Sequence, residues 1–286
     1  MLPDIAQEPT PPPARPLRDL GPRLISGVLM AVVALGLTWA SVWTFALLVL
    51  VVALVVAWEW GRVVRDGGID TIFIIHAVFV AGAVVLTYIG VPALALIGLV
   101  VGAILATLLG FAADGRLSAL GVLYAGLPAI ALIWLRASEQ LGLEATLFLL
   151  LVVIATDTGA YAAGRMIGGP RLMPSISPNK TWSGLAGGAG ASVLVAIVFA
   201  VSITTPLNAG RLAIIAVGLA LVSQAGDLME SALKRRHQVK DTSGLIPGHG
   251  GFMDRVDGLI VAAIAAGLLG ALINIKAPAS GILRWN

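Results

Sequence analysis

Cysteine is absent from the 286-residue chain, and charged side chains are scarce, at 12% of residues. The absence of cysteine excludes disulfides, thiolate metal sites and cysteine nucleophiles. A soluble domain of this length carries about twice this fraction of charged residues. The shortage of charge therefore argues against a soluble protein.

Apolar residues take the place of the missing charge and make up 58% of the chain. Apolar runs of about 18 residues or more recur between Leu24 and Ile275, and each can cross the hydrocarbon core of a bilayer as a helix. The alternating pattern of a β-barrel is missing, so helices have to satisfy the backbone hydrogen bonds inside the membrane. The sequence predicts an all-α, polytopic integral membrane protein.

About nine transmembrane helices are expected. The segment Leu24–Trp60 splits near Trp39–Ser41 into a hairpin of two spans, and the number falls to eight if its first arm does not cross. The other spans are predicted at 71–89, 92–111, 117–135, 143–164, 183–204, 211–229 and 256–275.

The chain divides into three regions. Residues 1–20 are polar and rich in proline, which predicts a disordered cytoplasmic tail. An N-terminal transmembrane region follows at 21–136. A C-terminal transmembrane region at 137–286 carries the long polar loops and the candidate catalytic residues discussed below.

The basic residues are unevenly distributed between the two sides of the predicted bundle. With the N-terminus inside, 14 of the 18 lysines and arginines fall on cytoplasmic segments and 4 on the opposite side. This bias favours an N-in, C-out orientation and places the polar loops 165–182 and 230–255 in the cytoplasm. We expect a multi-pass protein of the cell (inner or plasma) membrane whose active site faces the cytoplasm. The same bias explains the net charge of +3, so no nucleic-acid partner is expected.

Four acidic residues lie within or at the ends of apolar spans: Glu59, Asp157, Asp227 and Asp257. An unpaired aspartate at mid-bilayer costs about 2.5–3.5 kcal/mol, so such residues are candidates for function. For Asp157, the alternative to a functional role is an interhelical hydrogen bond. Glu59 is the weakest candidate, since it lies at the cytoplasmic end of its span, and a structural role is favoured for it.

Two pairs of carboxylates flank the second polar loop. Asp227 and Glu230 are three residues apart at the end of one span, and Asp254 and Asp257 repeat that spacing at the start of the last. Residues three apart share a helix face, so both pairs are expected at one interface. Oxygen ligands without cysteine suit a hard cation, and Mg²⁺ suits a site that substrate phosphates complete. The alternative is a set of separate salt bridges with the basic residues of the loop.

Both polar loops supply groups that can bind phosphate. In the first loop, Lys180 lies just before a predicted helix start, where backbone N–H groups and the helix dipole favour an anion. In the second, basic residues surround a glycine-rich turn whose backbone can approach a polyphosphate closely. These residues are Lys234, Arg235, Lys240, His249 and Arg255. A metal, a phosphate cradle and a membrane interface together predict phosphoryl or nucleotidyl transfer onto a lipid.

The segment Ser231–Asp257, SALKRRHQVKDTSGLIPGHGGFMDRVD, resembles the signature of the phosphatidate cytidylyltransferases, or CDP-diacylglycerol synthases, at every position that the signature specifies. The resemblance extends through DTGAYAAGR (157–165), SPNKTWSG (177–184) and QAGDLMES (224–231), and it covers the C-terminal half closely. It implies transfer of the cytidylyl group of CTP to phosphatidic acid, giving CDP-diacylglycerol and pyrophosphate, with Mg²⁺ as cofactor.

The resemblance also implies roles for individual residues. Asp227 and Asp254 are expected to hold metal, and Asp257 is the next candidate. Asp157 is expected to contact the metal ligands rather than the metal itself. The expected catalytic residues are Asp227, Asp254, Asp257, Lys234 and Arg235. The expected substrate-binding residues are Ser177, Asn179, Lys180, Thr181, Lys240, Asp241, His249, Gly250, Gly251 and Arg255.

Two other classes of function remain open. The nearest is other lipid phosphate chemistry, either a CTP-dependent lipid kinase or a cytidylyltransferase for another lipid phosphate. An ion-coupled transporter is a remote alternative, because it predicts polarity near mid-bilayer rather than at the cytoplasmic side. The run GLAGGAGAS (184–192) predicts close helix packing and allows a homodimer. The expected partners are CTP, phosphatidic acid and membrane lipids.

Overall fold

The computed structural model describes residues 31–110, 115–203, 208–246 and 250–284. Within these residues, eight helices are long and apolar enough to cross a membrane. They are α2 (Val42–Arg65), α3 (Thr71–Tyr88), α4 (Pro92–Leu109), α5 (Gly115–Arg136), α6 (Gly142–Met166), α7 (Trp182–Ser202), α8 (Ala209–Arg236) and α9 (Met253–Ile273). The predicted polytopic helical fold is confirmed for this part of the chain.

The ninth predicted span lies at the start of the described chain. Its first residues, 24–30, fall outside the described residues, and the rest forms a short apolar helix, Ala31–Ala40. The predicted break near Trp39–Ser41 is confirmed. Ser41 is the N-cap of α2, where its hydroxyl accepts from Thr44 N–H and the Thr44 hydroxyl accepts from Ser41 N–H in return.

Asp70 begins α3 in a similar way, because its carboxylate accepts from Phe73 N–H at 2.6 Å and binds Arg65 at 3.0 Å. Partial burial by itself raises the pKa of Asp70. The hydrogen bonds from Arg65 and from Phe73 N–H outweigh that effect and lower the pKa below its usual range.

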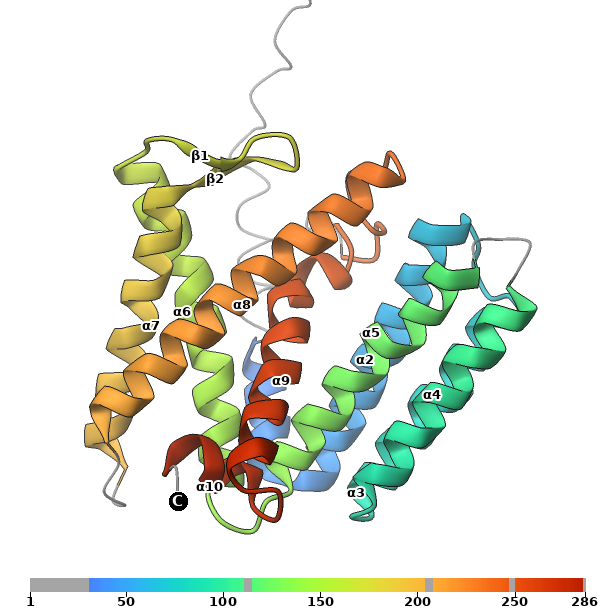
Figure 1. Ribbon diagram of the computed structural model, residues 1–286, viewed down its shortest axis with the longest axis horizontal. Helices are drawn as coiled ribbons and strands as arrows, with labels where there is room; N and C mark the ends of the chain where they lie inside the picture. The colour runs from blue at the N-terminus through green and yellow to red at the C-terminus, as the bar shows by residue number, and fades with distance from the viewer. Residues whose placement is uncertain (1–30, 111–114, 204–207, 247–249, 285–286) are drawn as a thin grey trace, which may run out of the picture.

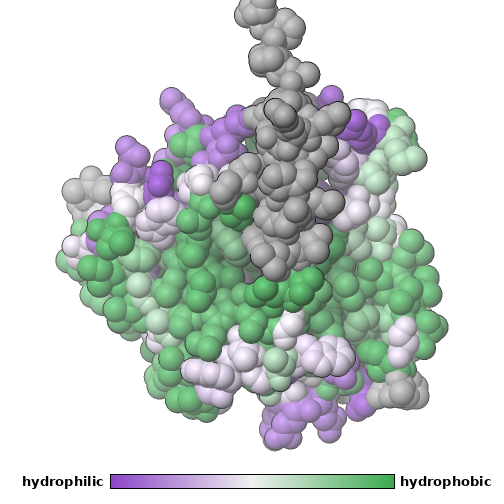
Figure 2. Space-filling view, turned by 180° about the vertical axis from the view of Figure 1, so that it is seen from behind, coloured by the Kyte–Doolittle hydropathy of each residue, from purple (hydrophilic) through white to green (hydrophobic). Residues whose placement is uncertain are grey.

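The helices form one bundle, with α9 between two groups (Figure 1). Helices α6 and α7 pack side by side, and α8 crosses obliquely in contact with α7 and α9. On the other side of α9 lie α2 and α5, with α3 and α4 beyond them. The short helix α10 (Pro278–Leu283) packs against the end of α9. Figure 2 shows a hydrophobic band across one face of the molecule with hydrophilic residues above and below it, as a bilayer requires.

Small residues bring α6 and α7 into close contact. A Cβ on Gly187 would collide with the Ala163 side chain and lie 2.9 Å from Gly159 O, and a Cβ on Gly188 would lie 2.8 Å from Thr156 O. Gly190, on another face of α7, has nothing within 4 Å of such an atom. The close packing predicted for this run is therefore confirmed at Gly187 and Gly188, and it occurs within one chain.

Two boundaries differ from the sequence prediction, and both affect the site. Helix α8 continues to Arg236 and α9 begins at Met253, so the loop between them is 237–252 and not 230–255. Three consecutive cations in the last turn of α8, which the helix dipole favours, explain the extension.

The other polar loop contains the one sheet of the described chain. Strands β1 (Arg171–Met173) and β2 (Ser177–Thr181) form an antiparallel hairpin, which the all-α prediction did not include. Gly168 and Gly169, both with positive φ, let the chain turn after α6 into this hairpin.

Candidate active site

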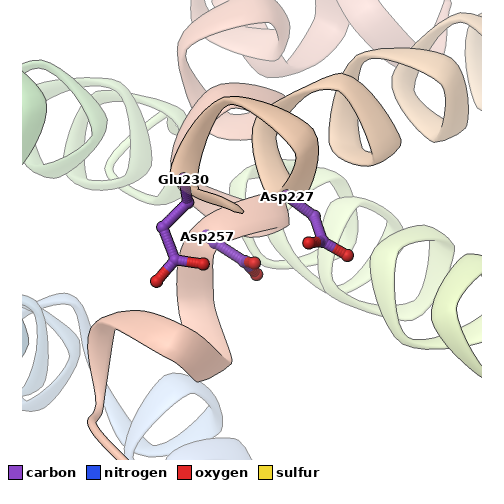
Figure 3. A group of neighbouring side chains, drawn as sticks. All are labelled: Asp227, Glu230 and Asp257. Atoms are coloured by element: carbon purple, nitrogen blue, oxygen red, sulfur yellow. The ribbon is translucent and has the colours of Figure 1, made fainter. Parts of the chain in front are cut away.

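Three carboxylates converge where α8 crosses α9 (Figure 3). One oxygen each from Asp227, Glu230 and Asp257 lies within 4.8 Å of the others. Asp227 and Glu230 share a face of α8, and Asp257 projects from the first turns of α9. The sequence prediction that the two helix ends meet is confirmed for these residues.

Two glycines let the helices approach closely enough for this. A Cβ on Gly226 would lie 2.9 Å from the backbone oxygen of Asp257, and a Cβ on Gly258 would collide with the Ser223 hydroxyl. Each glycine is adjacent in sequence to one of the aspartates. The crossing point of α8 and α9 therefore fixes where these carboxylates meet.

Lys180 reaches the carboxylates from β2. Its ammonium nitrogen lies 2.6 Å from Asp227 Oδ2 and 3.3 Å from the backbone oxygen of Gln224. The Gln224 side chain in turn donates to Asp157 Oδ1 at 3.2 Å. Asp157 thus makes the interhelical hydrogen bond considered as the alternative to its functional role, and the structure does not include it in the carboxylate group.

Lys234 links the carboxylate group to Asp254. Its ammonium nitrogen lies 3.1 Å from Glu230 Oε2 and 2.6 Å from Asp254 Oδ1. The second oxygen of Asp254 accepts from Gly251 N–H at 2.8 Å and Thr242 N–H at 3.0 Å. Asp254 therefore stands beside the carboxylate group, bound by a lysine and by the loop, and its place in the metal set stays a prediction.

Gly250 and Gly251 fit their positions for reasons of local packing. Gly250 has a φ of +82°, which favours glycine, and a Cβ there would lie 3.1 Å from Asp254 Oδ2. A Cβ on Gly251 would collide with the Thr242 hydroxyl and lie 2.7 Å from Glu59 Oε1. The backbone of this turn thus lies against carboxylates of the protein, and its predicted approach to a polyphosphate stays a prediction.

The other predicted substrate-binding residues are spread around this end of the bundle. Thr181 is the N-cap of α7, since its hydroxyl accepts from Gly184 N–H at 3.0 Å. Arg235 donates to the backbone oxygen of Ile176 in the hairpin at 3.4 Å. Ser177 is half-buried and Asn179 exposed on β2; Lys240, Asp241 and Arg255 are exposed, and His249 lies outside the described residues.

The carboxylate group suits Mg²⁺ by its chemistry. It offers oxygen ligands only, and Glu230 is buried, with Oε1 lacking a hydrogen-bond partner in the described part of the chain. A buried carboxylate oxygen without a donor is costly unless a cation binds it or the carboxylate takes up a proton. Asp227, Glu230 and Asp257 therefore fit a hard divalent cation.

Comparison with known proteins identifies the family of the chain. Residues 22–273 match the model of the cytidylyltransferase family. The chain belongs to that family. It is 38% identical over 259 residues to the phosphatidate cytidylyltransferase of Brucella suis, which covers 90% of this chain and 95% of the relative. A protein of the same name from Bacillus subtilis is 39% identical over 141 residues, 49% of this chain and 52% of the relative.

The residues expected from the sequence to hold metal or substrate did not include two that the structure brings into this region. Glu230 belonged to the carboxylate pairs that suit a cation, but it was not named among the metal ligands. Gln224, which positions Asp157, offers no sequence signal beyond its place in QAGDLMES.

Proposed function

We propose that this member of the cytidylyltransferase family transfers the cytidylyl group of CTP to phosphatidic acid, giving CDP-diacylglycerol and pyrophosphate. The observation that carries the proposal is the meeting of Asp227, Glu230 and Asp257 with Lys180 and Lys234 at one end of an apolar bundle. Such a site can bind a metal and phosphates next to a membrane lipid. The family match and the names of the relatives support the same reaction.

The reaction joins two anions. A phosphate oxygen of phosphatidic acid attacks the α-phosphorus of CTP, a P–O bond forms, and the bond from the α-phosphorus to the bridging oxygen breaks to release pyrophosphate. The attacking phosphate is already ionised, so the protein needs no general base. Its main tasks are to position the two anions and to offset their repulsion.

Asp227, Glu230 and Asp257 are proposed to hold Mg²⁺, which when bound neutralises phosphate charge and polarises phosphoryl oxygens. The ammonium groups of Lys180 and Lys234 contact these acids and can exchange a carboxylate oxygen for a phosphate oxygen of the substrates. The remaining predicted cations, Arg235, Lys240, His249 and Arg255, are proposed to assist with triphosphate and phosphatidate, and Asp254 to hold Lys234 and the loop.

An apolar cavity beside the site suits the lipid substrate. It measures about 420 Å³ and lies between α2, α5 and α9. Its lining includes Val256, which precedes Asp257 on α9, and Phe252, the N-cap residue of that helix. A lipid whose phosphate reaches the carboxylate group therefore has apolar protein surface next to it.

We place the active site on the cytoplasmic side of the cell membrane, with the N-terminus inside and the C-terminus outside. The support is the excess of lysine and arginine in the segments assigned to that side. A homodimer is compatible with this arrangement. However, two of the small residues that suggested a homodimer, Gly187 and Gly188, pack against α6 of the same chain.

A reconstitution assay tests the reaction. The purified chain is incubated with CTP labelled in the α-phosphate, phosphatidic acid and Mg²⁺, and both products are followed. We expect labelled lipid and pyrophosphate in equal amounts, and loss of both with EDTA. Release of CDP with a phosphorylated lipid would instead show kinase chemistry, and product formed only with another lipid phosphate would change the substrate.

A further inference from the structure

Glu59 is buried near the C-terminal end of α2 and binds a distant part of the chain. It is 0% exposed, and its oxygens accept from the hydroxyls of Thr242 and Ser243 and from the backbone N–H groups of Phe252 and Met253. The first two donors belong to the loop between α8 and α9. The other two are the amide of Phe252, the N-cap residue of α9, and the amide of Met253, the first residue of that helix.

These contacts make Glu59 the cap of α9. The helix begins at Met253 without a side-chain cap from its own N-cap residue, Phe252. The orphan N–H groups of a helix start need acceptors, and an anion there is favoured by the helix dipole. The carboxylate of Glu59, on a different helix, supplies both the acceptor and the negative charge. Its Oε1 lies 2.8 Å from Phe252 N.

The same loop also holds Asp254. Thr242 donates to Glu59 through its hydroxyl at 3.3 Å, and to Asp254 through both its hydroxyl, at 3.1 Å, and its backbone N–H, at 3.0 Å. Gly251 lies against both Thr242 and Glu59, so it has no room for a Cβ. Glu59, Thr242 and Asp254 therefore form one connected hydrogen-bond network at the start of α9.

We infer that Glu59 is a positioning residue for the transfer reaction: by capping α9 from α2, it fixes where the first turns of α9 present Asp254 and Asp257 to the substrates. This rests on the proposed function. Positioning matters to the rate because a displacement of about 1 Å in a catalytic site can slow the reaction about 100-fold.

Glu59→Gln in the full-length enzyme tests this role, because glutamine keeps the shape but turns one acceptor into an amide donor that faces peptide N–H groups. We expect kcat to fall about 100-fold, with little change in KM for CTP or phosphatidic acid. Hydrogen–deuterium exchange should become faster at the amides of Phe252 and Met253. Glu59→Asp keeps the charge on a shorter side chain, and we expect it to recover part of kcat.

Asp70→Asn is the matched control. Asp70 is also an acidic cap that accepts from a backbone N–H, at the start of α3, and its contacts are with Arg65 and Phe73 rather than the loop. We expect it to lower thermal stability while kcat and exchange at the start of α9 stay unchanged.

Two results would overturn the inference: normal kcat in Glu59→Gln despite faster exchange, or a reduced kcat with unchanged exchange. If Glu59→Gln does not fold, Ser243→Ala removes one donor and leaves the carboxylate, and the same paired readouts apply. Failure of the proposed function is distinguishable, because the unmodified protein would then form no CDP-lipid.

Discussion

In the part of the chain that the structure describes, the acidic side chains of the site outnumber the lysines that they contact. Five carboxylates share two lysine ammonium groups through direct contacts or a short chain of contacts: Asp157, Asp227, Glu230, Asp254 and Asp257 on one side, Lys180 and Lys234 on the other. Carboxylates this close repel one another and are stabilised by cations. The proposed divalent metal would balance this charge when bound, and the acids that ligate it would then matter more to the reaction than their neighbours.

Glu230→Gln should reveal that inequality. Glu230 is buried, and its Oε1 has no hydrogen-bond partner in the described chain, so the neutral variant should fold but bind the cation poorly. Loss of an outer-shell partner of a metal site costs about 10–100-fold, so loss of a direct ligand should reduce kcat/KM by about 100-fold or more. The measurement is the Mg²⁺ titration of transferase activity, with Glu139→Gln, an exposed acid, as the control. Normal Mg²⁺ dependence in Glu230→Gln would exclude it as a ligand.

The residue types of the site could be predicted from the sequence, but their pairings could not. Acids in apolar spans are conspicuous, and the three-residue spacing placed Asp227 with Glu230. The pair of Glu230 and Lys234 follows from their four-residue spacing on α8, but the contact of Lys234 with Asp254 depends on the angle at which α8 crosses α9, which no local pattern encodes. The role of Glu59 depends on donors more than 180 positions away.

Among the elements, α6 and α7 show how far small residues determine packing. Their contact brings the Cα of Gly187 against Ala163, while Gly190, three residues later, faces open space. The two positions are both glycines of α7, less than one turn apart, but they have different surroundings. They form a matched pair for testing how tight this contact is.

Gly187→Ala should destabilise the protein, and Gly190→Ala should not. The first adds a methyl group where Ala163 already lies, and such overpacking costs about 1–3 kcal/mol. The second removes a flexible residue from a helix, which by itself stabilises by about 0.5–1 kcal/mol. Thermal unfolding in detergent measures both. Equal midpoints for the two variants would contradict the close packing of α6 on α7.

Element boundaries were predictable where the chain carries its own stop signal. Ser41 and Thr44 form a reciprocal cap, so the break before α2 could be placed from sequence. The ends of α8 and α9 that face the loop were misplaced because hydropathy falls before the helices end, and the last turn of α8 carries three cations. The hairpin of β1 and β2 was missed because strands of three and five residues leave almost no periodic signal.

On the scale of the whole molecule, the hairpin and helix α10 lie at opposite ends of the bundle (Figure 1). The site residues cluster at the hairpin end, since Lys180 extends from β2 to Asp227. The proposed orientation therefore puts the hairpin in the cytoplasm and the region before α10 outside.

Single cysteines can test this orientation without background, because the chain contains none. Met173→Cys places a thiol on the exposed hairpin, and Lys276→Cys places one on the exposed segment before α10. A membrane-impermeant maleimide should label position 276 in right-side-out vesicles and position 173 only in inverted ones. The reverse pattern would overturn the orientation.

The cap that Glu59 provides also has a consequence for the order of synthesis. The amide donors of Phe252 and Met253 follow Glu59 by 193 and 194 residues. At about 5–20 residues per second, the carboxylate is made roughly 10–40 s before the groups that bind it. For that interval α2 carries an acid without these partners, and only the synthesis and insertion of α9 provide them. The hydrogen-bond network at the start of α9 is thus completed long after α2 has been made.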